Sequence, residues 1–284
     1  MTKIPARPLE PFGVELGVDL RDDVTDRRDE LANLFAAHDL LLVRGPKLTM
    51  DEQIRAVGCL GPVLYVDNGI MSRDTEIGLL GAALCFHSDY AYSPEPLIGI
   101  SLHAIDVVDD ETSTRFAAGR TAYERLSPEL RARVESLQAL QVFGADIGRR
   151  NRLAALDPRL PSTAHPLVSP HAGTGGRYLF APEMTTDSIV GLDPDESEEL
   201  VRQLFAVLYA ESNVLEHRWR EGDLVIWDNR CVVHARGDVS RVAHRVLQRV
   251  ALGTKGYFDL YPWLAEYSWA EDGSLVGPAT PAAS

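Results

Sequence analysis

The chain has 284 residues, 45% of them hydrophobic and 25% charged, so it is long enough to bury one substantial core. Its 42 acidic and 28 basic residues give a net charge of −14, which disfavours binding to nucleic-acid phosphates and to anionic membrane surfaces. The apolar runs are too short or too interrupted to cross a bilayer, and the N-terminus lacks an apolar signal core. These features predict a cytoplasmic protein with a small-molecule partner and no nucleic-acid or membrane partner, and they leave homo-oligomerisation open.

The first predicted elements along the chain are interpreted as structural. Residues 23–38 place apolar side chains on one face of an amphipathic helix, and the apolar run 40–43 that follows is typical of a buried strand. Thr49 and Glu52 have the spacing of a capping box, which predicts a second helix that ends near Gly61.

From about residue 97 onward, short β-rich runs alternate with clusters of Gly, Pro and Asp, and the predicted strands are 97–103, 178–180, 223–227 and 245–252. Two helical insertions, 122–140 and 195–210, interrupt them. This pattern predicts a mixed α/β fold with a β core, arranged as an antiparallel sandwich or jelly roll. A single domain is expected over 1–270, followed by a flexible tail over 271–284 that is rich in Ala, Pro, Gly and Ser.

The segment His87-Ser88-Asp89 places two metal-ligand side chains two positions apart, and in an extended strand such side chains point to the same face. The spacing also occurs by chance in a chain with 8 histidines and 42 acidic residues, so a third ligand is required. His234 supplies it, because it follows the buried strand predicted over 223–227. Two imidazoles and one carboxylate on one face of an octahedron leave three positions open, as in non-haem Fe(II) oxygenases.

The remaining histidines and the cysteines are interpreted as structural. None of these histidines has an acidic residue two positions on, and the set is His103, His165, His171, His217 and His244. Cys85 and Cys231 lie close in sequence to the proposed ligands, but small buried thiols usually only pack. With Cys59 they form an odd set without a Cys-x-x-Cys pair, so reduced thiols are expected.

The stretch from His217 through the run 222–231 to His234 resembles the distal-histidine motif of the taurine dioxygenase and aryloxyacetate dioxygenase family. The resemblance spans about residues 12–256. It implies a double-stranded β-helix (jelly roll) with N-terminal and inserted helices, and an enzyme that uses Fe(II), 2-oxoglutarate and O₂. By this resemblance His87, Asp89 and His234 are both the catalytic residues and the metal ligands.

The resemblance also assigns residues to 2-oxoglutarate, whose far carboxylate needs a guanidinium partner. Arg249 lies 15 residues after His234, the family's usual interval, and the segment that begins at Thr114 resembles the family's threonine segment. The residues before Thr114 depart from the family pattern, so Thr112 is the fallback. Arg245 is interpreted as structural, as is Arg230.

The sequence predicts a class of substrate and the segments that form its pocket. Loops 63–82 and 142–176 are the expected pocket walls, and the candidate substrate contacts are Tyr65, Asn68, Tyr90 and Arg236. The favoured function is oxidation, by default hydroxylation, of an unactivated carbon of a small organic acid, with release of succinate and CO₂. The alternative is hydroxylation, desaturation or cyclisation of a larger natural-product intermediate. A zinc-dependent hydrolase and a noncatalytic ligand-binding jelly roll are the rivals from other classes.

Overall fold

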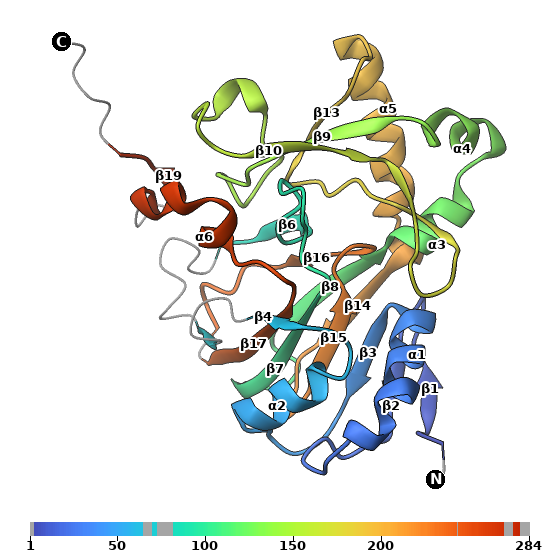
Figure 1. The fold of residues 1–284 in the computed structure, drawn as a ribbon, viewed down its shortest axis with the longest axis vertical. Coiled ribbons are helices and arrows are strands. Elements are labelled where there is room, and N and C mark those ends of the chain that lie inside the picture. Colours follow the sequence, from blue (N-terminus) through green and yellow to red (C-terminus); the bar gives the residue numbers. More distant parts are fainter. Residues whose placement is uncertain (1–2, 65–69, 73–81, 243, 270–274, 279–284) are drawn as a thin grey trace.

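A computed structural model describes residues 3–64, 70–72, 82–242, 244–269 and 275–278. Two facing β-sheets form its centre (Figure 1). The larger sheet has the order β1 (Ala6–Pro8), β2 (Val14–Leu16), β3 (Leu40–Val43), β15 (Leu224–Asp228), β7 (Gly99–Val107), β17 (Arg245–Leu252) and β4 (Val63–Leu64), and β5 (Ile70–Ser72) also pairs with β17. The smaller sheet has the order β14 (Val214–Arg218), β8 (Ser113–Ala118), β16 (Val232–Arg236) and β6 (Leu84–His87). The predicted mixed fold with a β core is confirmed.

Alternation along the strands divides the buried side chains into layers. In β3, Leu40 and Leu42 point between the two sheets, whereas Leu41 and Val43 point to the outer face of the larger sheet. All five residues of β15 are buried because helices cover the outer face and the smaller sheet covers the inner face. The continuous apolar runs in the sequence are therefore strands that are covered on both sides.

Two helices near the N-terminus cover the outer face of the larger sheet (Figure 1). Helix α1 (Arg28–His38) follows a 3₁₀ turn (Thr25–Arg27), and it ends at Asp39, which adopts a left-handed conformation with φ 63°. Helix α2 (Met50–Val57) begins at the capping box of Thr49 and Glu52, as the spacing predicts. Inside the helix, the buried Gln53 donates a hydrogen bond to Ser101 Oγ at 3.0 Å and fixes α2 to the sheet.

The insertions pack against the outer face of the smaller sheet (Figure 1). The predicted helix over 195–210 is confirmed as α5 (Pro194–Leu208). The prediction of one helix over 122–140 is wrong, because the chain forms α3 (Gly119–Arg125), α4 (Pro128–Val134) and then β9 (Gln138–Val142). Pro128 cannot continue a helix, and Ser127 caps the new one by accepting from the Leu130 amide at 3.1 Å. Strand β9 pairs with β10 (Ser162–Pro166) and β13 (Thr186–Ile189).

The remaining elements are short. They are the hairpin of β11 (Val168–Pro170) and β12 (Arg177–Leu179), helix α6 (Tyr257–Leu260), 3₁₀ turns at Leu153–Ala155, Glu211–Asn213 and Pro262–Glu266, and the pair β18 (Ser268–Trp269) and β19 (Leu275–Val276). Strand β19 lies within the predicted tail, whose residues 271–274 and 279–284 lie outside the described part of the chain. Among the helices that are described, none has the length and apolar character needed to span a membrane.

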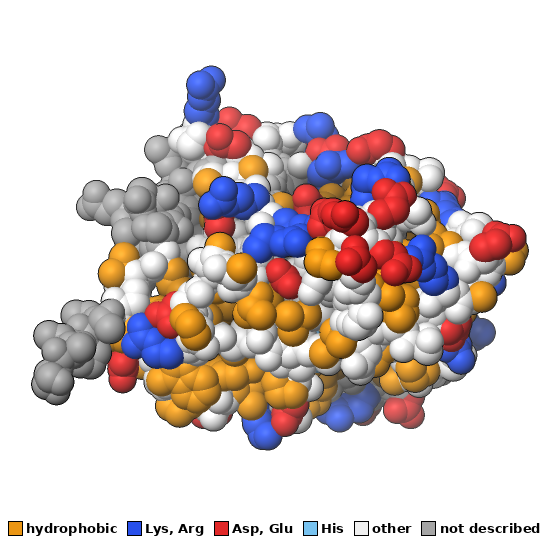
Figure 2. Space-filling view, turned by 90° about the horizontal axis from the view of Figure 1, so that it is seen from above, with side chains coloured by type: hydrophobic (Ala, Val, Ile, Leu, Met, Phe, Trp, Pro, Cys, Tyr) orange, Lys and Arg blue, Asp and Glu red, His pale blue; other side chains and the backbone are white. Residues whose placement is uncertain are grey.

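The surface mixes charge and apolar area. Figure 2 shows acidic and basic side chains interspersed along one side of this face, with apolar side chains gathered below them. On this face, therefore, the acidic side chains alternate with basic ones and do not form one continuous acidic patch.

Candidate active site

The two predicted histidine ligands come from neighbouring strands of the smaller sheet. His87 is the last residue of β6 and His234 is the central residue of β16, and the two are directly opposite each other in the ladder. Their ring centroids are 4.0 Å apart. Asp89 Oδ1 lies 3.5 Å from His87 Nε2 and 3.9 Å from His234 Nε2. The structure thus brings the three predicted ligands into one group that could hold a metal ion.

Asp89 reaches this group by a different route from the predicted one. The extended strand ends at His87, and Asp89 lies in the turn that follows, so the simple alternation of a strand does not place it. The buried side chain of Asn229 holds the turn instead: its Oδ1 accepts from the Asp89 amide at 3.0 Å, and its Nδ2 donates to the Asp89 carbonyl at 2.9 Å. Ser88 Oγ also donates to the Asn229 carbonyl at 2.7 Å. The spacing of the ligands alone could not reveal this contact of Asn229 with the turn.

The protonation states fit a cation. Burial lowers the pKa of His87, and burial together with the neighbouring His87 lowers the pKa of His234 well below its usual value. Burial alone would raise the pKa of Asp89, but Arg249 and the two histidines hold that pKa below its usual value. Neutral imidazoles and an ionised carboxylate are the forms that bind a metal. His87 Nδ1 lies 3.0 Å from the Cys85 carbonyl, which accepts its proton and leaves Nε2 for the ion.

Thr114 and Arg249, the residues predicted to hold 2-oxoglutarate, both line the cavity beside the metal ligands. Arg249 Nη2 donates to Asp89 Oδ2 and thereby joins β17 of the larger sheet to the metal-binding turn. Thr114 Oγ1 accepts from Trp219 Nε1 at 3.0 Å, so the hydroxyl proton is available to a bound carboxylate. Thr112, the fallback, is buried and does not belong to the lining.

The cavity has a volume of about 410 Å³, within the range of roughly 300–1,000 Å³ that is usual for small-molecule sites. Tyr90 and Arg236 line it, as predicted, whereas Tyr65 and Asn68 lie outside the described residues. The predicted loop 142–176 contributes the lining residues Phe143, Gly144 and Ile147.

Sequence reasoning missed two features of the cavity. Arg245, interpreted as structural, is buried and lines the cavity on the same face of β17 as Arg249. Four further aromatic side chains, from Tyr92, Phe143, Trp227 and Tyr257, join Tyr90 in the wall. The ring centroids are 5.0 Å apart for Tyr92 and Phe143 and 5.9 Å apart for Tyr90 and Tyr257. The four-residue spacing of the arginines on a strand could have indicated a shared face; the aromatic residues carry no such signal.

Comparisons with known proteins identify the family of this chain. A family model described as "Taurine catabolism dioxygenase TauD, TfdA family" matches residues 5–251. The alpha-ketoglutarate-dependent 2,4-dichlorophenoxyacetate dioxygenase of Cupriavidus pinatubonensis is 29% identical over 86% of this chain and 95% of its own length. Pentalenolactone F synthase of Streptomyces arenae is 30% identical over 72% of each chain.

A solved structure of a taurine dioxygenase from Burkholderia xenovorans superposes with a TM-score of 0.75 at 24% identity, covering 96% of this chain and 95% of the other, which confirms the jelly-roll fold. These relatives give no support to a zinc-dependent hydrolase or to a noncatalytic binding protein. Alpha-ketoglutarate is 2-oxoglutarate, and the family model spans most of the chain. The protein therefore belongs to the TauD, TfdA family and is an Fe(II)- and 2-oxoglutarate-dependent dioxygenase.

Proposed function

We propose that this dioxygenase oxidises a carbon of a small organic acid with a flat, apolar body, with hydroxylation as the default outcome. The observation behind the proposal is a single cavity that combines the metal-ligand group, five aromatic side chains and the guanidinium groups of Arg236, Arg245 and Arg249. Aromatic rings favour an aryl or similarly flat body, and arginine forks favour carboxylates. One relative is named for 2,4-dichlorophenoxyacetate, which is an organic acid with a flat aromatic body.

In this proposal His87, Asp89 and His234 hold Fe(II), which supplies the oxygen chemistry when 2-oxoglutarate and O₂ are bound. Asn229 and the Cys85 carbonyl orient two of these ligands. The buried aromatic and aliphatic wall excludes water around the reacting carbon.

In this proposal two arginines of β17 and Thr114 together bind 2-oxoglutarate. Arg249 contacts Asp89, so its guanidinium lies at the metal end of the cavity, where the keto-acid end binds. Arg245 faces the same cavity four residues earlier, roughly 13 Å along the strand, and its long side chain can reach a different part of the ligand. We assign the far carboxylate to Arg245 and Thr114, and we place Arg249 at the keto-acid end.

The reaction class is tested by measuring succinate from anaerobically iron-loaded protein that receives 2-oxoglutarate, air and one member of a substrate panel. The panel pairs aryloxyacetic acids with the corresponding aryloxyethanols, which keep the ring and lack the acid. We expect iron-dependent succinate that acids stimulate and alcohols do not, and none from His87→Ala. Stimulation by the alcohols equal to that by the acids would refute the acid-substrate proposal.

The arginine assignment is tested with 2-oxopentanoate, which has the keto-acid end of 2-oxoglutarate but no far carboxylate. Loss of a hydrogen bond between charged groups costs about 1.5–3 kcal/mol, so Arg245→Gln should raise KM for 2-oxoglutarate roughly 10- to 100-fold. It should leave KM for 2-oxopentanoate nearly unchanged. Arg249→Gln should weaken both keto acids, as measured by O₂ consumption. If the two variants show the opposite pattern, the far carboxylate belongs to Arg249.

A larger natural-product intermediate is the second candidate substrate. The relative named pentalenolactone F synthase favours it, as does the aliphatic part of the wall, which includes Leu84, Ile100, Leu102 and Met184. Larger polycyclic aliphatic acids added to the same succinate assay separate the two candidates, since the better substrate couples more succinate to its own oxidation.

A further inference from the structure

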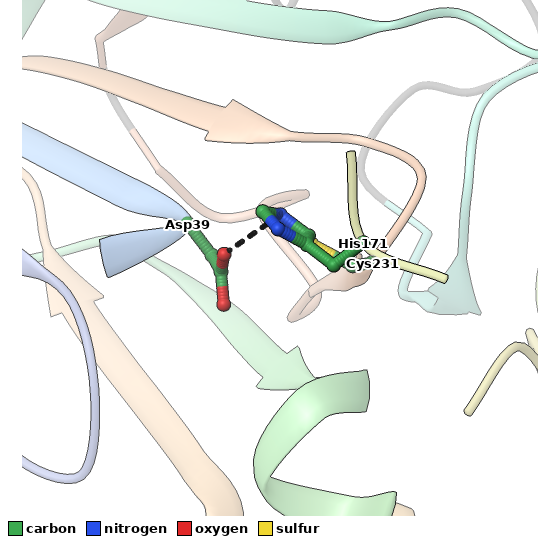
Figure 3. Close-up of side chains that lie close together, drawn as sticks. All are labelled: Asp39, His171 and Cys231. Carbon is green, nitrogen blue, oxygen red and sulfur yellow. Dashed lines mark ion pairs between the residues drawn. The ribbon is translucent and has the colours of Figure 1, made fainter. Parts of the chain in front are cut away.

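A second group of ligand-type side chains lies outside the active-site cavity. Asp39 follows α1, His171 follows β11, and Cys231 lies in the turn between β15 and β16. Figure 3 shows the three side chains converging, with the His171 ring between the other two groups. One ligand atom from each lies within 4.8 Å of the others, and all three residues are buried, with 2–3% of their surface exposed.

Two atoms of this group have no hydrogen-bond partner among the described residues. They are Asp39 Oδ1 and His171 Nε2, which face each other at 3.3 Å. A charge-assisted hydrogen bond between them would be about 2.7–2.9 Å long. Ligand atoms around a tetrahedral Zn²⁺, each about 2.0–2.2 Å from the ion, lie about 3.3–3.6 Å apart. The separation therefore suits two ligands of one cation better than a direct hydrogen bond.

The surroundings hold these ligands in place. His171 Nδ1 accepts from the Thr174 amide at 3.2 Å and lies 3.0 Å from Thr174 Oγ1. Binding of an ion at Nε2 would move the ring proton to Nδ1, where Oγ1 can accept it and the amide contact is lost. Arg120 Nε holds the outer oxygen of Asp39, Oδ2, at 3.0 Å. Asp228 Oδ2 lies 3.8 Å from His171 Nε2 and offers a fourth ligand, although it also pairs with Arg230.

We propose that Asp39, His171 and Cys231 form a second, structural site for a divalent cation of the zinc class. A histidine nitrogen, a carboxylate oxygen and a cysteine sulfur are the ligands that Zn²⁺ takes. Binding converts the Cys231 thiol to a thiolate and releases one proton to solvent, so the two anionic ligands neutralise the dication. The site joins three segments from distant parts of the chain and lies apart from the oxidising metal.

The competing arrangement is a metal-free cluster. In it His171 Nδ1 accepts from the Thr174 amide at 3.2 Å, so the ring proton lies on Nε2 and points towards Asp39. Burial raises the pKa of the Cys231 thiol well above its usual value, which keeps that thiol protonated in the absence of an ion. The two arrangements differ in the bond from sulfur to metal, and this bond has its own spectrum.

Co²⁺ is the probe, added to the full-length protein after removal of all metal by a chelator under anaerobic conditions. We expect two bound equivalents and a thiolate-to-cobalt charge-transfer band in the near ultraviolet. The proposed iron ligands include no sulfur, so the band reports on the second site alone. Cys231→Ser should lose the band and one equivalent, whereas the double variant with His87→Ala and Asp89→Ala should lose one equivalent and keep the band.

Cys85→Ser and Cys59→Ser are the matched controls, since each removes one thiol elsewhere, and both should keep the band. A wild-type protein that binds one equivalent without the band would overturn the proposal, as would a band that disappears in Cys85→Ser. X-ray absorption at the zinc edge of the Zn²⁺-loaded wild type needs no variant. Averaged over the two loaded sites, it should show about half a sulfur scatterer per zinc at about 2.3 Å, and a shell of nitrogen and oxygen alone would also overturn the proposal.

Discussion

Asn229 lies outside the proposed ligand set but fixes the backbone of the turn that carries Asp89. Its amide bonds to the Asp89 amide and carbonyl at 3.0 and 2.9 Å, and to the Leu97 carbonyl at 3.1 Å. The turn that carries Asp89 thus has its backbone groups satisfied by one buried residue. Without the Asn229 amide, the Asp89 carboxylate would still be able to bind a metal ion, but the turn would no longer hold it in position.

Asn229→Ala should weaken Fe(II) or Mn²⁺ binding about 10- to 100-fold, the usual effect of losing a residue that orients a ligand. Asn213→Ala is the matched control, because Asn213 is equally buried and bonds to two carbonyls, of Ala118 and Leu208, in another part of the chain. Both variants should lose about 1–3 kcal/mol of stability through unsatisfied backbone groups. Isothermal titration with Mn²⁺ separates them; equal metal affinity in the two variants would contradict the role given to Asn229.

At this scale the sequence predicted the chemistry better than the geometry. The three residues predicted from the His-x-Asp spacing and the distal histidine lie together in a group that could hold a metal ion, and Thr114 and Arg249 line the cavity. Arg245 was missed because an arginine near the end of a strand is usually exposed. The four-residue spacing indicates that Arg245 shares a face with Arg249, but it does not show that this face is buried, since burial here depends on the facing sheet.

Among the elements, the turn that leads into β15 is tightly constrained. Gly222 has φ 85°, and a Cβ at this position would lie 1.9 Å from the Gly45 carbonyl oxygen. Gly191 has a similar φ of 82°, but a Cβ there would meet nothing within 4 Å. The two glycines share a backbone conformation and differ only in the available space.

Gly222→Ala should therefore cost more stability than Gly191→Ala. A left-handed alanine alone costs roughly 1 kcal/mol, whereas an added backbone clash brings the loss at Gly222 to roughly 3–4 kcal/mol. Urea unfolding followed by tryptophan fluorescence gives both values. Equal losses would show that Gly45 moves aside at little cost.

Element prediction succeeded where a local signal was strong. The capping box of Thr49 placed the start of α2, and the apolar stripe placed α5. It failed over 122–140, where residues 138–142 form β9 because they complete a three-stranded sheet with β10 and β13. Strand partners that lie 20 or more residues away along the chain determine whether such a segment becomes a strand, and local periodicity gives no information about these partners.

In the molecule as a whole, the two sheets contribute different parts of the site. The histidine ligands lie on the smaller sheet, whereas Arg245 and Arg249 lie on the larger one. A ligand that chelates the metal and reaches the arginines is held by both sheets. The strand spacing predicted an antiparallel sandwich or jelly roll, but it did not predict which sheet carries which part of the site, because local spacing does not fix the strand order.

Mn²⁺ and 2-oxoglutarate together should therefore raise Tm more than Mn²⁺ alone. At a 2-oxoglutarate concentration 100 times its Kd, the stabilisation is about 2.7 kcal/mol, or roughly 5–10 °C in a chain of this size. Differential scanning calorimetry measures the shift, with His87→Ala as the control that should not respond to the pair. An equal shift with Mn²⁺ alone would show that the keto acid does not hold the two sheets together.

The direct pairing of His87 with His234 also bears on the order of events during synthesis. The two residues are opposite each other in the ladder between β6 and β16, yet most of the chain separates them. The ribosome must release β16 before the second imidazole can meet the first, and closing so long a loop is slow. A nascent chain whose β16 has not yet emerged therefore lacks the complete set of proposed iron ligands.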